Sequence, residues 1–238
     1  MRRSWVRFPP WALTPGRRLK RPADTYNNSA VPDRVGVEDE DVARYGVGRL
    51  LTLSDGVFAI ALTLLVLSLR VDITTPASAL GAALRDARPE LYAYGLSVLV
   101  IGAFWMGHHR LYSQIVRVDS RLLWMNILYL GLVALIPYPT DLLGRYGHEA
   151  DAVALYGTVI GLGALVSVGI SIYAERHRLV DVGSASGALA RGLPIAIVFL
   201  GSVPIAFSSP KAAQFVWLLA VPLRIVAPRL SSRSSARA

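Results

Sequence analysis

Cysteine is absent from this chain of 238 residues, and charged residues make up only 17% of it. The missing thiols exclude disulfide bonds and thiol chemistry. A soluble domain usually carries about 25% charged residues, so the low charge content argues against a soluble fold. The sequence also has no HExxH motif, no phosphate-binding glycine loop and no evident pair of nucleophile and base. A membrane enzyme is therefore the weakest interpretation.

Apolar residues are abundant instead: 53% of the chain is hydrophobic, and the mean hydropathy is +0.45. The charges cluster at the two ends of the chain and between long apolar runs, which is typical of a polytopic membrane protein. The net charge of +9 comes from basic residues that flank apolar segments. It therefore indicates orientation in a membrane rather than binding to nucleic acid.

Six apolar segments predict an all-α fold, an integral membrane bundle of six helices. They cover residues 50–69, 90–108, 122–143, 152–174, 189–207 and 212–228. Most reach about 30 Å at 1.5 Å per residue, which is the thickness of the hydrocarbon layer. The short connections predict helices that alternate in direction. Because the loops on the side of the N-terminus are richer in Lys and Arg, both termini are expected to be cytoplasmic.

The regions outside the bundle differ in composition. We expect residues 1–46 to be a basic, proline-rich and disordered cytoplasmic arm, residues 47–228 to be the membrane domain, and residues 229–238 to be a disordered basic tail. Residues 75–89 are expected to form a short amphipathic piece on the outer surface. No second copy of the first apolar segment is present, so the chain holds one six-helix unit.

The first apolar segment carries Asp55 within its first third. A charged residue at the centre of a membrane helix costs about 2.5–3.5 kcal/mol on insertion scales and suggests a functional site. Lipid offers it no partner, so we expect Asp55 to face polar groups inside the bundle. The candidates at matching depth are Trp105, His108 and His109, with Asn126 at the start of the next span.

Three interpretations of this polar group remain open. It can simply hold helices together, Asp55 can relay protons, or the two histidines can bind a metal. Adjacent residues on a helix point about 100° apart, so a metal site at His108 and His109 is the least favoured, and no metal is expected.

The same segment also carries a narrow apolar stripe. At 100° per residue, Leu53, Val57, Ile60, Leu64 and Leu67 fall within 80° of one another, and Asp55 lies on the far side of the helix. Periodicity alone suggests ordinary packing, against lipid, another helix or a second copy of the same stripe.

The sequence RLLTLSDGVFAIALTLLVL resembles the signature helix of the transmembrane protein 175 family of potassium channels. The family motif of Arg, three variable residues and Phe-Ser-Asp corresponds here to Arg49, residues 50–52, and Leu53, Ser54 and Asp55. Leucine therefore replaces the motif phenylalanine. The segments YGLSVLVIGAFWMGHHRLY and LLWMNILYLGLVALIPYPTDLL resemble the second and third family helices. The resemblance covers residues 45–225 and is strong up to residue 143.

The resemblance implies a homotetramer with a central pore lined by the first helix. It implies rings of Ile60, Leu64 and Leu67 as a hydrophobic gate, with Thr63 beside the pore. It also implies a structural network away from the pore, made of Arg49, Ser54, Asp55, Trp105, His108 and Asn126. No cofactor is implied beyond the permeant potassium ion, and the only partners are further copies and the bilayer. The chain has no TVGYG filter, which the family also lacks.

Two functions follow as hypotheses. The first is a potassium-permeable leak channel in a prokaryotic inner membrane. The alternative is a proton-coupled secondary transporter that uses Asp55. A transporter usually shows an inverted repeat and a broken helix. No repeat is evident, although Pro194, Gly201 and Pro204 leave room for a broken fifth helix.

Overall fold

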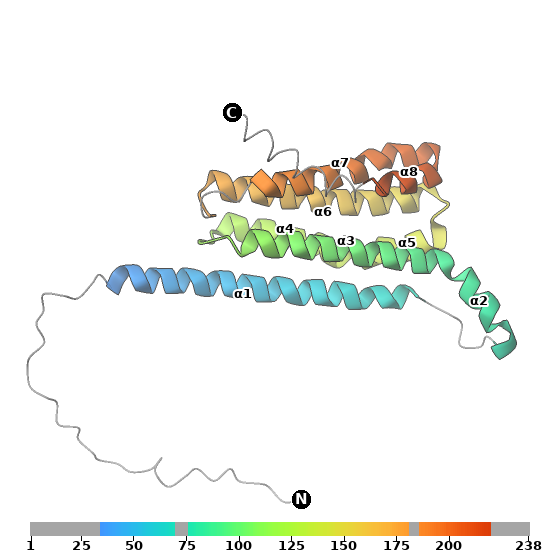
Figure 1. Ribbon diagram of the computed structural model, residues 1–238, viewed down its shortest axis with the longest axis horizontal. Helices are drawn as coiled ribbons and strands as arrows, with labels where there is room; N and C mark the ends of the chain where they lie inside the picture. Colours follow the sequence, from blue (N-terminus) through green and yellow to red (C-terminus); the bar gives the residue numbers. More distant parts are fainter. Residues whose placement is uncertain (1–33, 70–75, 181–185, 220–238) are drawn as a thin grey trace, which may run out of the picture.

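The computed structural model describes residues 34–69, 76–180 and 186–219. Side chains are described for residues 46–69, 76–180 and 192–219. Within these ranges the fold is almost entirely helical (Figure 1). The helices are α1 (Arg34–Leu65), α2 (Leu80–Asp86), α3 (Arg88–Tyr112), α4 (Ser120–Leu135), α5 (Pro137–Tyr146), α6 (Ala150–Arg176), α7 (Ser186–Ser208) and α8 (Pro210–Trp217). Short 3-10 turns cover Val66–Ser68 and Ala77–Ala79.

Four helical stretches are long and apolar enough to cross a membrane: Gly46–Ser68, Arg88–Tyr112, Ser120–Tyr146 and Ala150–Arg176. They correspond to the first four predicted spans. The fifth predicted span is an apolar helix of shorter described length, Gly192–Ser208. Of the sixth, residues 212–228, the structure describes only the part up to residue 219, most of which belongs to α8. The predicted alternation of direction is visible among the long helices in Figure 1.

The third span is divided into two helices. α4 ends at Leu135 and α5 begins at Pro137. Proline has no backbone N–H, so it cannot continue the helical hydrogen-bond ladder. The N–H of Ile136 bonds the carbonyl oxygen of Val133 at 3.1 Å, three residues back. The sequence predicts a distortion here, and the structure places it one residue before Pro137.

The bundle consists of two groups of helices. α6, α7 and α8 pack together, while α1 lies along α3 and α4 on the opposite side of the molecule (Figure 1). Glycines let α6 and α7 approach closely. A Cβ atom on Gly157 would lie 3.1 Å from the carbonyl oxygen of Phe199, and one on Gly161 would lie 2.5 Å from Cγ of Leu200. Small residues have this role at many helix contacts in membranes.

The regions predicted to lie outside the spans are described only in part. The predicted disordered arm, residues 1–46, lies mostly outside the described residues, but from Arg34 onward the backbone is helical and continuous with α1. The stretch from residue 34 to the end of α1 contains no proline, so nothing interrupts the hydrogen-bond ladder before the span. The expected piece at residues 75–89 is seen in part, as the seven-residue helix α2. The predicted tail, residues 229–238, lies outside the described residues.

We predict that Gly161→Val destabilises the bundle. Overpacking a tight site costs about 1–3 kcal/mol, because the added methyl groups would overlap Leu200. The expected result is a lower apparent melting temperature of the protein in detergent, followed by loss of the folded peak in size-exclusion chromatography. Gly201→Ala is the control, because a Cβ atom there meets nothing within 4 Å. Equal melting temperatures for the two variants would contradict the close contact between α6 and α7.

Candidate functional site

α1 has one face packed into the bundle. Its buried residues recur every three or four positions, as expected for one side of a helix. They are Val47, Leu50, Ser54, Phe58, Ala61 and Leu65. This face lies against α3 and α4. Five of these six positions fit an ordinary apolar or small-residue contact, and Ser54 is the position where a polar network begins.

Ser54, Asn126 and His108 form a buried hydrogen-bonded chain that joins α1, α4 and α3. The amide nitrogen of Asn126 donates to the hydroxyl of Ser54 at 3.3 Å, and that hydroxyl donates to the carbonyl oxygen of Leu50 at 2.8 Å. Oδ1 of Asn126 lies 2.9 Å from Nε2 of His108. An amide oxygen only accepts, so this assignment requires the Nε2 atom to carry the proton. Every link therefore has a donor and an acceptor.

Aromatic rings surround His108. Its ring stacks on Tyr112 with centroids 4.0 Å apart and lies parallel to Tyr129 at 5.7 Å. Phe58 from α1 lies 5.7 Å away at a tilted angle. None of these three rings belongs to the network predicted from the sequence. Helical spacing offered a signal for two of them, because Tyr112 is four residues after His108 and Tyr129 is three residues after Asn126, which places each pair on one helix face.

Asp55 lies on the flank of α1 rather than inside the bundle. Its carboxylate accepts a hydrogen bond of 2.9 Å from the indole N–H of Trp105, and both residues are exposed on the described chain. Trp105 in turn stacks on His109, with centroids 5.5 Å apart. The expected single cluster is therefore divided in two. Ser54 occupies the centre of the buried face, and Asp55 follows it by 100° around the helix, which turns it toward the edge of α3.

The two histidines point to different surroundings. His108 is buried, whereas His109 is exposed. Their side chains therefore do not converge on a common point. Among the described residues no group of three His, Cys, Asp or Glu side chains has an arrangement that fits a metal ion. Arg49, the first residue of the motif, is exposed on α1.

The apolar stripe occupies the other flank of α1. Ile60 is 60% exposed, Leu64 42% and Leu67 61%. Leu53, earlier in the stripe, is exposed as well, whereas Val57 packs partly against the core. Thr63 is also exposed, and its hydroxyl donates to the carbonyl oxygen of Ile60 at 2.8 Å. The helix thus presents large apolar side chains that the subunit itself leaves uncovered.

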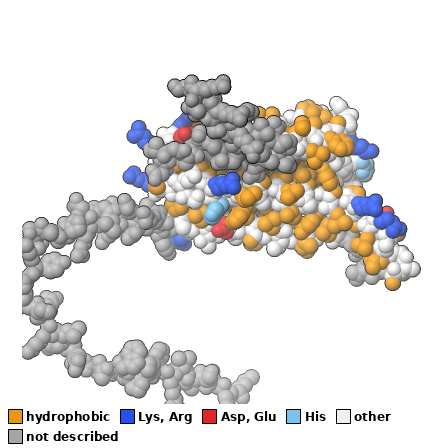
Figure 2. Space-filling view, viewed as in Figure 1, with side chains coloured by type: hydrophobic (Ala, Val, Ile, Leu, Met, Phe, Trp, Pro, Cys, Tyr) orange, Lys and Arg blue, Asp and Glu red, His pale blue; other side chains and the backbone are white. Residues whose placement is uncertain are grey.

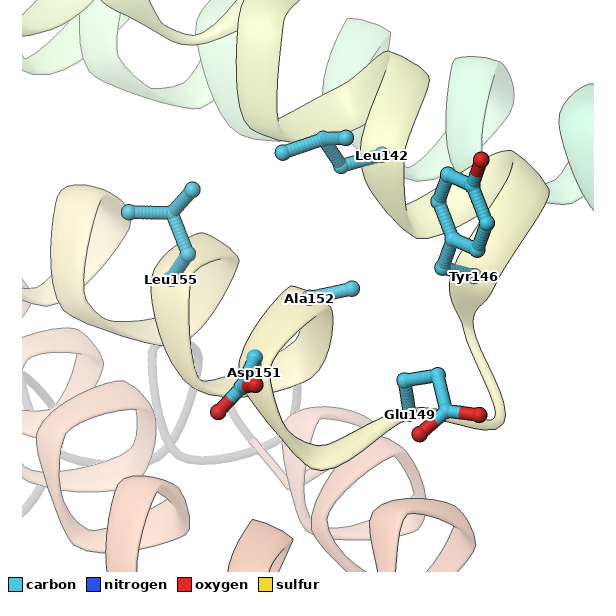
Figure 3. A pocket seen from close by; sticks show the side chains of 6 residues that line it. All are labelled: Leu142, Tyr146, Glu149, Asp151, Ala152 and Leu155. Carbon is cyan, nitrogen blue, oxygen red and sulfur yellow. The ribbon is translucent and has the colours of Figure 1, made fainter.

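A pocket of about 230 Å³ lies at the corner between α5 and α6 (Figure 3). It is lined by Leu142, Tyr146, Glu149, Asp151, Ala152 and Leu155. Leu142 and Leu155 point toward each other across the hollow. Its two carboxylates belong to exposed residues, and none of the sequence-predicted site residues contributes to it. The pocket is thus separate from the network around Ser54.

Residues 49–137 match the family described as "Endosomal/lysosomal potassium channel TMEM175". This range contains the complete polar network, the stripe on α1, and the helices α3 and α4. The match ends at residue 137, close to residue 143, up to which the resemblance seen in the sequence is strong. The predicted relationship to this family is therefore confirmed for this part of the chain.

Individual relatives agree with this match. A protein named a potassium channel from Streptomyces collinus is 38% identical over 136 residues, which is 57% of this chain and 66% of that protein. One from Chryseobacterium is 36% identical over 115 residues, or 48% of this chain and 57% of that protein. The matched region thus spans less than two thirds of either relative.

A solved structure extends the similarity to the fold. It is titled as a lysosomal potassium-selective channel TMEM175 homolog from Chamaesiphon minutus. It superposes with a TM-score of 0.66 at 27% identity, over 77% of this chain and 98% of that one. The shared architecture therefore extends over much more of the chain than residues 49–137.

We predict that Asn126→Leu destabilises the fold. The change leaves His108 and Ser54 without their shared partner, and an unsatisfied buried polar group costs about 1–3 kcal/mol. The melting temperature in detergent should fall, and a double-mutant cycle with Ser54→Ala should show coupling between the two positions.

Ile127→Leu provides the matched control, because the neighbouring residue is exposed on the same helix. It should melt at the wild-type temperature. If Asn126→Leu and Ile127→Leu were equally stable, the buried chain would not be the link between α1, α3 and α4.

Proposed function

With the resemblance to the TMEM175 family confirmed over residues 49–137, we propose that this chain is a subunit of a potassium-permeable leak channel. Its relatives from Streptomyces collinus and Chryseobacterium are named potassium channels, and the Chamaesiphon minutus structure is titled as potassium-selective. The chain conducts ions and is not an enzyme.

The proposed assembly is a homotetramer of six-helix subunits around a central pore lined by α1. The sixth span would run over residues 212–228, as the sequence predicts. Both termini would face the cytoplasm, and the membrane would be the inner, or plasma, membrane of the cell. The supporting observation is the exposure of one side of α1: α3 and α4 cover one face of the helix, whereas Ile60, Leu64 and Leu67 are exposed within the part of the chain that the structure describes.

The exposed stripe on α1 carries the proposal. Four copies of Ile60, Leu64 and Leu67 would form three successive apolar rings along the pore. A constriction of this kind gates by dewetting, because water and ions leave a narrow apolar passage. A small widening admits partly hydrated cations, and potassium gives up its water more readily than sodium. Thr63 lies beside the stripe and offers a hydroxyl oxygen near the same depth.

Asp55 has a structural role in this proposal. Its hydrogen bond to Trp105 ties α1 to α3 on the flank away from the stripe, while Ser54, His108 and Asn126 fix the buried face. Arg49 belongs to the same motif at the N-terminal end of the span. These residues would hold α1 at the rotation that turns the stripe toward the pore axis.

We predict that Ile60→Asn increases potassium flux through the full chain reconstituted in vesicles. A polar ring would stay wetted, and lowering the barrier by about 1.4 kcal/mol would raise conductance about tenfold. Single-channel recording with potassium on one side and sodium on the other should also show reduced selectivity.

Ile197→Asn is the matched control, because Ile197 on α7 is as exposed as Ile60 but lies on a different helix. The conductance of the Ile197→Asn variant should equal that of the wild type. If neither Ile60→Asn nor Ile60→Ala changed conductance or selectivity, the proposed gate at Ile60 would be wrong.

We further predict that Asp55→Asn keeps potassium conductance and lowers thermal stability only slightly. Asparagine retains an oxygen that accepts the Trp105 N–H, so the link to α3 survives. Flux should show no saturation and no dependence on a proton gradient. Saturable, proton-driven uptake that disappears in Asp55→Asn would instead support the alternative, a proton-coupled transporter.

A further inference from the structure

One end of the bundle carries an excess of positive charge. The loop between α3 and α4 and the C-terminal end of α6 lie together there (Figure 1). Together with the adjoining ends of α3 and α4 they contribute five arginines and two carboxylates: Arg110, Arg117, Arg121, Arg176 and Arg178, with Asp119 and Glu175. The described residues at the opposite end hold four basic side chains and five carboxylates: Arg85, Arg88, Arg145 and Lys211, with Asp86, Glu90, Asp141, Glu149 and Asp151.

Backbone contacts join the two segments at the basic end. The N–H of Val116 donates to the carbonyl oxygen of Leu179 at 2.9 Å, and Ile115 pairs with Val180 in an antiparallel bridge. Ile115 and Leu179 are both buried. The two segments, which we call the paired loops (residues 113–119 and 177–180), therefore have a fixed position relative to each other. They connect the group formed by α3 and α4 with the group formed by α6 and α7.

Two exposed arginines flank the bridge. Arg117 follows Ile115 by two residues, and Arg178 precedes Val180 by two. Arg178, just after α6, has a φ of 54°, in the left-handed region that residues other than glycine seldom adopt, and the N–H of Leu179 beside it bonds the carbonyl oxygen of Ala174 at 2.8 Å. The bridge therefore holds in place two loops that each carry one exposed cation.

The nearby carboxylate Asp119 is already engaged. It accepts a hydrogen bond of 2.8 Å from the N–H of Leu122, which caps α4, and one of 2.6 Å from the hydroxyl of Tyr173 on α6. These two hydrogen bonds lower the pKa of Asp119, and the hydrogen bond from Tyr173 has the larger effect. The carboxylate therefore stays ionised while it accepts them. The ion pairs found among the described residues, Arg145 with Asp141 and His148 with Glu149, are both at the opposite end.

We propose that the paired loops bind the phosphate of an anionic lipid headgroup, with Arg117 and Arg178 as its principal ligands. The loops follow the ends of membrane-length helices, which is the depth at which headgroups lie. Basic pockets in this position commonly bind such headgroups, and the planar guanidinium group suits two-pronged hydrogen bonding to phosphate. A phosphate bound by both arginines would strengthen the connection between the two helix groups.

Figure 2 shows the wider setting of this site: apolar side chains cover the middle of the bundle, and most of the Lys and Arg side chains in view lie toward its ends. The inference requires that the chain is embedded in a membrane, and it does not depend on ion conduction. A binding measurement therefore tests it separately from the channel.

Native mass spectrometry of the full chain in detergent, titrated with phosphatidylglycerol, tests the proposal. Wild-type protein should retain this lipid in preference to phosphatidylcholine. R117Q/R178Q should bind it about 10- to 30-fold more weakly, since each basic residue near a charged membrane surface contributes about 1 kcal/mol. R117K/R178K should bind with an affinity between those of the wild type and R117Q/R178Q, because it keeps both charges but loses the two-pronged geometry of the guanidinium group. Soluble glycerol 3-phosphate should compete poorly, because the proposed occupant is the lipid.

R85Q/R88Q is the matched control, with two arginines removed at the opposite end, and it should bind phosphatidylglycerol like the wild type. The helical signal in circular dichroism should be the same for all variants. The proposal would be overturned if R85Q/R88Q or R117K/R178K lost as much affinity for phosphatidylglycerol as R117Q/R178Q does. It would also be overturned if the wild type showed no preference for phosphatidylglycerol over phosphatidylcholine. Displacement of the lipid by millimolar glycerol 3-phosphate would overturn it as well.

Discussion

The buried hydrogen-bonded chain from Ser54 through Asn126 to His108 sets how α1 is rotated against the rest of the subunit. Lipid provides no hydrogen-bond partner, so a polar side chain in a membrane span must find one within the protein. Asn126 meets this requirement for two helices at once, with its amide nitrogen on Ser54 and its oxygen on His108. Turning α1 about its axis would break these bonds and bring other residues into the core.

That rotation has consequences for both flanks of the helix. On one flank Asp55 meets Trp105 at the edge of α3. On the other, Ile60, Leu64 and Leu67 stay uncovered. A helix that is polar on one flank, buried in the middle and apolar on the other has two different outer neighbours. The proposed tetramer supplies one of them, a pore formed by four such stripes, and it explains why this apolar surface is left open by the subunit itself.

The two ends of the bundle are constructed differently. At one end the paired loops and the helix ends beside them hold five arginines near a carboxylate that is already hydrogen-bonded. At the other end basic and acidic residues are nearly balanced, and the ion pairs are found there. This asymmetry fits the positive-inside rule, and it places the connection between the two helix groups where anionic headgroups would lie.

The helical class, four of the membrane spans and the stripe on α1 could be predicted from the sequence, because hydrophobic length and periodicity are local properties. The sequence also identified the polar residues, and its resemblance to the TMEM175 family was confirmed for residues 49–137. The burial of Ser54 and the exposure of Asp55 could not be predicted in this way, since they depend on where α3 and α4 lie around the helix. The same holds for the rings around His108 and for the pairing of the loops that carry Arg117 and Arg178. These positions come from contacts between segments far apart in the chain, which no local pattern records.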